Sequence, residues 1–303
     1  MAKFLKLALF LLLGGIAAIA LTYGIAASRR PPRTNLSRSL FAGVDYHRVF
    51  RTDPRPFMLH VVAIDLQRTG VEPFVTPGEP PPAPHDREFF ARTTTTALQN
   101  HSLQLAINGS FFYPFHAHHP LDFYPHSGDP VGALGQVMSD GTPYSPPQAN
   151  WQVLCFADVA SIAAERCPQG TRQAVAGFEI LRAGEPVAVS DASHDRLYPR
   201  TAVGISDDGT RLWLAIVDGR QPFYSRGVTL LELSEVLRAL GAQSALNLDG
   251  GGSTTLATEM DGRAEILNAP IHTRVPMRQR PVANQLGFYA LPLEEPGRSP
   301  ALP

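Results

Sequence analysis

The stretch at residues 247–255, NLDGGGSTT, constrains the fold of this chain more than any other segment. It follows a short apolar run at 244–248 that is typical of a strand, and it places Asp249 directly before three glycines. Glycine tolerates positive φ and has no side chain, so a ligand can approach the backbone closely. Successive peptide N–H groups in such a turn can also converge on an anion. The strand therefore ends either in a binding site or in a tight turn that simply requires glycine.

Proline and glycine are frequent along the whole chain. The 303 residues include 28 prolines and 25 glycines, which favour a loop-rich, strand-containing protein over a helical bundle. Strands are expected at 44–65, 103–108, 151–160 and 177–189, where apolar and β-branched residues lie between turn signals. Residues 76–85 and 113–145 are expected to be irregular, because proline and glycine interrupt them.

The C-terminal third has the most regular pattern. Segments 201–205 and 211–219 flank the turn SDDGT, which favours a hairpin. Thr229 and Glu232 form a capping box that opens a helix, and Gly241 ends it. A second helix at 87–100 is a weaker prediction, since its run of threonines forms helix poorly. Together these elements predict an α+β fold, a single globular domain with a mixed β-sheet and few helices.

An apolar, uncharged run at residues 7–27 opens the chain, with lysines before it and arginines after it. Its 21 residues suffice to cross a bilayer as a helix. The run is longer than the apolar region of most cleaved signals, but the small residues at 26–28 leave cleavage open. Either reading places the remainder outside the cytoplasm. The expected organisation is a signal peptide or membrane anchor at 1–28, a tether at 29–43, a globular domain at 44–292 and a tail at 293–303.

The cysteines and the charge balance agree with an exported protein. Cys155 and Cys167 are the two cysteines, and in an oxidising compartment they are expected to pair, the alternative being two unrelated core residues. The formal net charge of −1 gives no basic surface for nucleic acid. The sequence contains no G-x-S-x-G, Walker or CxxC motif, which removes several common enzyme classes.

Three strand ends carry polar residues beside glycine: Asn108, Asp218, and the pair Asn247 and Asp249. If these strands are neighbours, their ends meet at one edge of a sheet, where ligands commonly bind. Asp218 and Asp249 are the carboxylates best placed for acid–base work, although a strand-ending Asp-Gly pair is also ordinary turn chemistry. Arginine forks suit a phosphate, and the candidates are Arg200, Arg220 and Arg280.

A histidine-rich tract raises the question of a metal. It contains His116, His118, His119, Asp122, His126 and Asp129. Imidazole and carboxylate together suit zinc and other divalent ions, but the spacing matches no ordered zinc motif. A solvated or substrate-lining loop is the alternative, and we expect no cofactor.

Five segments, taken in order, resemble the phosphodiester glycosidase family: NGSFF, RTAVGISDDG, LWLAIVDGR, GVTLLELSEVLRALG and ALNLDGGGST. The resemblance covers roughly residues 59–291. It implies hydrolysis of a sugar-1-phosphodiester at the anomeric carbon of the sugar, which leaves a phosphomonoester. The matching motifs imply a site lined by Asn108, Arg200, Asp218, Arg220, Asp249, Gly250, Gly251 and Ser253. Asn247 and Arg280 are added from the residues themselves.

Two other functions stay open at this point. One is a non-catalytic envelope module that binds glycan or an anionic polymer in the same cleft. The other is a metal-dependent phosphodiesterase that uses the histidine-rich tract. The expected partners are a sugar phosphodiester or glycan substrate and, through the N-terminal segment, a membrane. The expected location is the periplasm or cell envelope of a bacterium.

Overall fold

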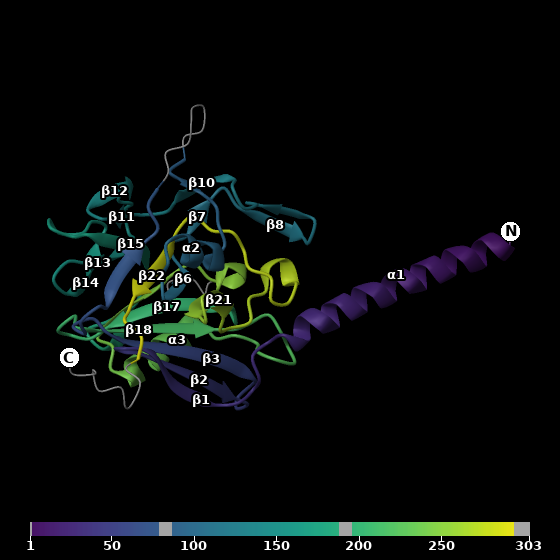
Figure 1. Cartoon of the computed structure of the whole chain (residues 1–303), viewed down its shortest axis with the longest axis horizontal. Coiled ribbons are helices and arrows are strands. Elements are labelled where there is room, and N and C mark those ends of the chain that lie inside the picture. Colours follow the sequence, from purple (N-terminus) through teal and green to yellow (C-terminus); the bar gives the residue numbers. More distant parts are fainter. Residues whose placement is uncertain (1, 79–86, 188–195, 294–303) are drawn as a thin grey trace, which may run out of the picture.

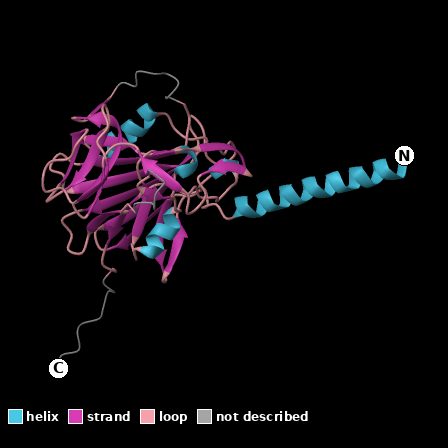
Figure 2. Cartoon of the chain, turned by 90° about the horizontal axis from the view of Figure 1, so that it is seen from above, coloured by secondary structure: helices cyan, strands magenta, loops and turns pink. Residues whose placement is uncertain are grey.

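The computed structural model describes residues 2–78, 87–187 and 196–293 (Figure 1). The proline-rich loop expected at 76–85 and the tail expected at 293–303 therefore lie largely outside the described residues. Helix α1, Ala2–Ser28, projects away from a domain made mostly of strands, as Figure 2 shows. Its residues Leu9–Ser28 are long and apolar enough to cross a membrane. Two further α-helices lie in the described part of the domain, α2 at Thr94–Asn100 and α3 at Leu230–Leu240.

Two large β-sheets dominate the domain. The larger has the strand order β1-β2-β3-β18-β17-β19-β15-β11-β12, with β13, β14 and β16 paired off this path, and the smaller has the order β21-β20-β6-β22-β4. Their strands are β1 Leu36–Phe41, β2 Val44–Arg51, β3 Phe57–Asp65, β4 Glu72–Val75, β6 Leu105–Asn108, β11 Val137–Ser139, β12 Thr142–Ser145, β13 Gln152–Phe156, β14 Ala160–Ala164, β15 Gln173–Arg182, β16 Glu185–Pro186, β17 Arg200–Ile205, β18 Arg211–Val217, β19 Ser244–Asn247, β20 Leu256–Met260, β21 Arg263–Ile266 and β22 Gln285–Tyr289.

Minor elements complete the chain. Strands β5 Phe89–Phe90, β7 Phe112–Tyr113 and β10 Pro130–Ala133 form a small sheet, and β8 His116–His119 pairs with β9 Asp122–Tyr124. Two single 3₁₀ turns lie at Gly251–Ser253 and His272–Arg274. The expected α+β class is confirmed. Where a mixed sheet was expected, the ladders among the described strands are antiparallel.

The main hydrophobic core lies between the two large sheets. It joins Val203 and Leu214 of the larger sheet to Ile107 and Leu286 of the smaller one. The outer face of the larger sheet is covered by α3, and α2 packs on the outer face of the smaller sheet. Successive side chains of a strand point to opposite faces, so each sheet buries one set in the central core and the other under a helix. The result is a four-layer α–β–β–α arrangement.

Helix α3 has the ends that its sequence predicts. Thr229 is the N-cap, and its side chain accepts a hydrogen bond from the backbone N–H of Glu232. The carboxylate of Glu232 in turn accepts a hydrogen bond from the backbone N–H of Thr229. Gly241 closes the helix in the left-handed region, at φ 102°. The buried face carries Leu233 and Leu237, which pack on the larger sheet. The expected hairpin is also present, with β17 and β18 paired from Arg200–Val217 to Ile205–Leu212.

Three local expectations need revision. Residues 113–145 were expected to be irregular, yet they contain the second residue of β7 and all of β8 to β12. The helix expected at 87–100 begins only at Thr94, after strand β5. Strand β1 lies inside residues 29–43, which were expected to be a tether, so part of that segment is paired into the larger sheet. The strands from β7 to β12 are only two to four residues long, so they carry little of the alternating pattern that identifies a strand in sequence.

The expected disulfide is confirmed. Cys155 of β13 is bonded to Cys167, with their Cα atoms 5.7 Å apart. Both side chains are buried beside Trp151 and Val153, in a small apolar cluster of their own. The bond closes a 12-residue separation that includes β14, and it holds this hairpin against β15.

Candidate active site

Asn108, at the end of β6, joins the two sheets at one edge. Its Nδ2 donates to the backbone oxygen of Asp249 at 2.5 Å. Its Oδ1 accepts from the hydroxyl of Thr201 in β17 at 2.9 Å and from the backbone N–H of Thr255 at 3.1 Å. This side chain is fully buried, and its amide uses both of its polar ends. The expected convergence of the β6 and β19 strand ends therefore occurs, with Asn108 as the link.

The glycine turn uses part of its own backbone inside the fold. The N–H of Gly251 donates to the oxygen of Pro199 at 2.9 Å, and the N–H of Ser253 donates to the oxygen of Gly250 at 3.2 Å. These two amides are therefore not directed at a ligand, contrary to a simple anion-binding nest. Gly251 has φ +64°, a value that favours glycine.

The glycines instead leave room for arginines. A Cβ on Gly251 would lie 3.3 Å from Nη1 of Arg220, and a Cβ on Gly252 would lie 2.6 Å from Nη2 of Arg280. Contacts this short force an atom to move, so side chains at these positions would displace the guanidinium groups. The absence of side chains thus lets two cationic forks pack directly on the turn that follows Asp249.

A cavity of about 400 Å³ opens beside this turn. Its walls come from Phe111, Phe115, Ala117, Tyr198, Pro199, Arg200, Arg220, Asn247, Asp249, Gly250, Gly251, Gly252 and Arg280. Among these described lining residues, Asp249 is the single carboxylate, and three are arginines. The cavity thus combines one acidic group, three arginines and aromatic side chains, which is a combination that suits a small anionic ligand.

Asp249 is half-buried, and its Oδ2 atom has no hydrogen-bond partner among the described residues. Burial raises the pKa of this carboxyl group, and the nearby charge of Arg280 and the bond from Ser253 offset only part of the effect. Because this oxygen is buried at the wall of a cavity and makes no hydrogen bond of its own within the described part of the chain, it is a candidate to accept a proton or to bind a substrate hydroxyl.

Arg280 is held on two sides. Its Nη1 donates to the hydroxyl of Ser253 at 3.0 Å, and its Nε donates to Nδ1 of His272 at 3.2 Å. The guanidinium carbon lies 4.2 Å from the ring centre of Phe115. Burial lowers the pKa of Arg280 to about 10, so the group is still charged at neutral pH. Its remaining donor, Nη2, adjoins Gly252 at the cavity wall.

His272 is a site residue that sequence reasoning missed. It is fully buried, and burial followed by the charges of Arg280 and Arg278 lowers its pKa to about 3. The ring is therefore neutral at physiological pH, and since Nδ1 accepts from Arg280, we assign its proton to Nε2. Neither its position in the sequence nor its neighbours identify it, because its role depends on a contact made only in the fold.

The other two expected arginines differ in exposure. Arg220 is exposed, has φ +57° and lies with its guanidinium carbon 4.5 Å from the ring centre of Tyr198. Arg200 is buried, and its Nη2 donates to the backbone oxygen of Arg196 at 2.9 Å. Burial alone would raise the pKa of Tyr198, but bonds and charges from Arg220 and Arg196 lower it. Both arginines line the cavity.

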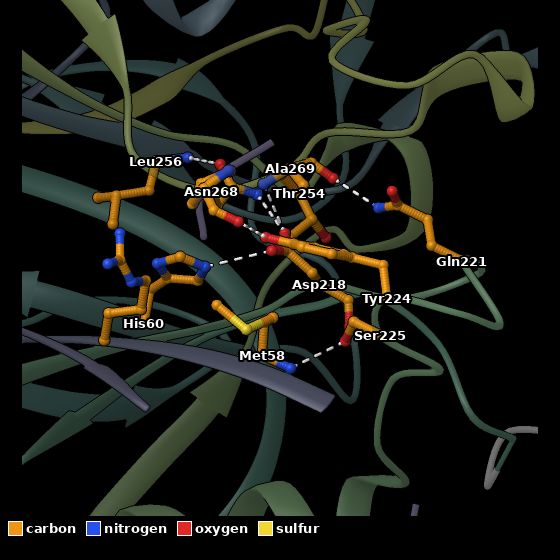
Figure 3. Close-up of polar contacts among 12 residues, drawn as sticks. Met58, His60, Asp218, Gln221, Tyr224, Ser225, Thr254, Leu256, Asn268 and Ala269 are labelled. Atoms are coloured by element: carbon orange, nitrogen blue, oxygen red, sulfur yellow. Dashed lines mark hydrogen bonds and ion pairs between the residues drawn. The ribbon is translucent and has the colours of Figure 1, made fainter. Parts of the chain in front are cut away.

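Asp218 lies elsewhere, fully buried at the end of β18 (Figure 3). Its Oδ1 accepts from Nδ2 of Asn268 at 3.0 Å and from the backbone N–H of Ala269 at 2.8 Å. Its Oδ2 is 3.2 Å from Nε2 of His60, whose Nδ1 is 2.8 Å from the hydroxyl of Tyr46. Asp218 is not among the residues that line the cavity. The structure thus brings Asp249 together with the arginines but keeps the second expected carboxylate in the core.

The histidine-rich tract forms the β8–β9 hairpin and the loop after it. His116 pairs with Asp122 at 3.1 Å, and His126 pairs with Asp129 at 3.3 Å, all at the surface. Within the described residues, no group of three or more histidine, cysteine or acidic side chains is arranged to hold a metal ion. His118 and His119 line a second, neighbouring cavity.

The fold and this cavity define an α+β protein with a cationic site built around one carboxylate. The chain belongs to the phosphodiester glycosidase family, whose model matches residues 101–289 and so includes every residue that lines the cavity. No curated protein matches the chain.

Solved structures share the fold at low sequence identity. The catalytic domain of zebrafish N-acetylglucosamine-1-phosphodiester alpha-N-acetylglucosaminidase, auto-inhibited by its pro-peptide, aligns with TM-score 0.58 and 20% identity over 87% of this chain and 92% of its own. A hypothetical protein from Synechocystis aligns with TM-score 0.55 and 16% identity over 86% of this chain, which spans only 64% of that protein. A protein from Burkholderia pseudomallei designated as exported gives TM-score 0.55 and 16% identity, over 78% of this chain and 74% of its own.

Proposed function

We propose that this protein is a hydrolase that cleaves a sugar-1-phosphodiester at the anomeric carbon, releasing the sugar and a phosphomonoester. The observation that carries the proposal is the meeting of Asp249, Arg220 and Arg280 in one cavity, with Oδ2 of Asp249 unpartnered among the described residues. Family membership supports the reaction class. A substrate with a sugar on one side of a phosphate and an ester on the other would satisfy both the carboxylate and the guanidinium groups.

In this proposal the arginines bind the phosphate and stabilise the charge that it gains as it leaves. Water attacks the anomeric carbon, and the bond between that carbon and the phosphate oxygen breaks. The electron pair leaves with the phosphate, and Asp249 accepts the proton from water. A phosphate departs without protonation far more readily than a sugar alkoxide does, so a second carboxylate is not required as an acid.

We assign Asp218 a positioning role. Both of its oxygens are engaged by buried groups, and its Oδ1 fixes the backbone at Ala269. Asn268 also donates to the oxygen of Thr254, and its Oδ1 accepts from the backbone N–H of Leu256, so the network supports the chain just after the glycine turn. This differs from the catalytic role first expected for Asp218, because a fully buried and fully bonded carboxylate offers nothing to a substrate.

We further propose that α1 is retained as an anchor and that the domain works outside the cytoplasm, in a bacterial cell envelope. Helix α1 is apolar on all sides along Leu9–Ser28, which suits a membrane span better than a surface-lying amphipathic helix. The disulfide between Cys155 and Cys167 supports an oxidising compartment. A similar fold in a Burkholderia protein designated as exported agrees with this location.

The test uses the full chain in detergent, a panel of sugar-1-phosphodiesters and oxygen-18 water. Label in the released sugar supports attack at carbon. Label in the phosphate would instead indicate a phosphodiesterase and contradict the proposal. Asp249→Asn should lower kcat by roughly 10²–10⁴-fold, whereas Asp207→Asn, on an exposed turn, should leave it unchanged. Binding without turnover across the panel, equal in wild type and Asp249→Asn, would favour the glycan-binding module.

A further inference from the structure

A second cavity, of about 880 Å³, lies beside the first. The two share the lining residues Ala117, Tyr198, Arg220 and Arg280. Arg220 and Arg280 are the groups assigned above to the phosphate, so whatever the phosphate carries on its far side would extend into this second cavity. Its walls therefore bear on the identity of the phosphate-bearing partner, which the family alone does not supply.

The second cavity is strongly cationic. Its described lining includes Arg196, Arg226 and Arg274 besides the two shared arginines, and no carboxylate. These three additional side chains are exposed, and none of them forms a salt bridge with any carboxylate that the structure describes. Arginines that have no salt-bridge partner attract anions, so this cavity favours a negatively charged group.

The N-terminal helix also lines this cavity. Ile19 and Tyr23 of α1 line the cavity together with His118, His119 and Pro120 of the β8–β9 hairpin. Figure 1 shows α1 leaving the domain on the side that carries β8. A cavity that is lined both by arginines and by residues of an apolar helix suits amphiphilic molecules, because it offers an anion site and an apolar surface together.

The helix is joined to the domain by docked contacts. The guanidinium carbon of Arg30 lies 5.3 Å from the ring centre of Tyr224, whose hydroxyl donates to the oxygen of Pro31 at 2.9 Å. Nη1 of Arg33 donates to the oxygen of Phe223 at 3.0 Å. A few residues further on, the chain enters β1. These contacts place the C-terminal end of α1 directly against the domain.

Exposed apolar side chains lie on the same side. Phe223 is 92% exposed beside the docked Arg33, and Leu121 is 90% exposed next to Pro120 of the cavity wall. Exposed apolar side chains at loop tips suit the interface between headgroups and acyl chains. Two loops from different parts of the fold thus expose apolar side chains beside the cavity that α1 lines.

We propose that the phosphate-bearing partner is a membrane lipid. The substrate is then a lipid-linked sugar phosphodiester, presented by the same membrane that holds α1 and bound with its phosphate region among the arginines of the second cavity. This inference rests on the proposed glycosidase function. Hydrolysis would release a water-soluble sugar and leave a lipid monophosphate in the bilayer. A soluble polyanion would also suit the arginines, but it would gain nothing from the apolar wall of Ile19 and Tyr23.

The experiment reconstitutes the full chain in phosphatidylcholine nanodiscs and compares two esters of each sugar 1-phosphate in a small panel. One is the hexadecyl ester, which inserts into the disc, and the other is the water-soluble methyl ester. We expect kcat/KM for the hexadecyl ester to exceed that for the methyl ester at least tenfold. The double variant R226S/R274S should reduce this ratio by on the order of tenfold. R263S, an exposed arginine on β21, is the matched control and should leave the ratio unchanged.

Each outcome bears on one idea. Equal kcat/KM for the two esters in wild type, or a double variant that slows both esters equally, would overturn the lipid assignment while leaving the glycosidase intact. If neither ester of any sugar is cleaved, the proposed function itself fails. Thermal unfolding of each variant in the same discs shows whether a lost preference reflects a lost fold.

Discussion

Asp249→Asn should make the protein more stable at neutral pH even as it removes activity. Burial raises the pKa of Asp249 in the folded state above its ordinary value. A raised carboxyl pKa means that folding is favoured below the unfolded pKa of about 3.9 and that this contribution is lost as pH rises through the folded pKa. The wild-type protein therefore carries an ionised, poorly solvated group at pH 7. Asparagine has the same shape, and it removes that ionisation.

The magnitude follows from the linkage between pKa and stability. One pKa unit corresponds to about 1.4 kcal/mol, and about 1 kcal/mol moves the Tm of a chain somewhat smaller than this one by ~2–4 °C. We therefore expect Asp249→Asn to melt a few degrees above wild type at pH 7 to 8 and at the same temperature as wild type near pH 4.

Thermal unfolding across pH 4 to 8, followed by intrinsic fluorescence, measures this directly. Asp207→Asn serves as the control, because Asp207 is exposed on the turn between β17 and β18. Its melting curve should follow wild type at every pH. A variant at position 249 that is less stable at pH 7, or whose difference from wild type does not change with pH, would refute the reasoning. Such a result would mean that attraction to Arg280 outweighs burial.

Three further changes probe the scaffold. Replacing Cys155 and Cys167 together by alanine should cost about 3 kcal/mol from loop closure, seen as a lower Tm that reducing agent no longer alters. Gly252→Ala places a Cβ 2.6 Å from Nη2 of Arg280, so it should weaken inhibition by a phosphomonoester at least severalfold, and unchanged inhibition would count against a phosphate role. Tyr46→Phe removes the hydroxyl that bonds a buried histidine and should cost about 1–3 kcal/mol in urea unfolding.

Local signals were enough for the elements whose determinants are local. The helix Leu230–Leu240 has both caps encoded within a few residues, and the turn at 206–210 sets the register of the hairpin around it. The glycine turn was equally visible, because three consecutive glycines after an apolar strand carry their own structural meaning. For these elements, the residues that determine the local structure lie within the element or directly beside it, so the sequence alone predicts them.

Pairing between strands and contacts between distant residues decided the rest. Strands β7 to β12 are two to four residues long and interrupted by proline and glycine, so only their partners across the sheets define them. The burial of Asp218 depends on His60, which is 158 residues earlier in the chain. His272 becomes part of the site through one hydrogen bond, which its Nδ1 accepts from Arg280. None of these pairings leaves a periodic mark in the sequence.

The glycine turn shows how a correct motif can carry a different physical reason. Its glycines suggested an anion held by backbone N–H groups. The N–H groups of Gly251 and Ser253, however, donate to the backbone oxygens of Pro199 and Gly250. What the turn provides is space, which Arg220 and Arg280 fill. An anion-binding site built from side chains can be placed beside a carboxylate without electrostatic conflict, because the guanidinium charges also stabilise ionised Asp249. Binding of the phosphate would draw those charges away from Asp249 and raise its basicity at the moment when a base is needed.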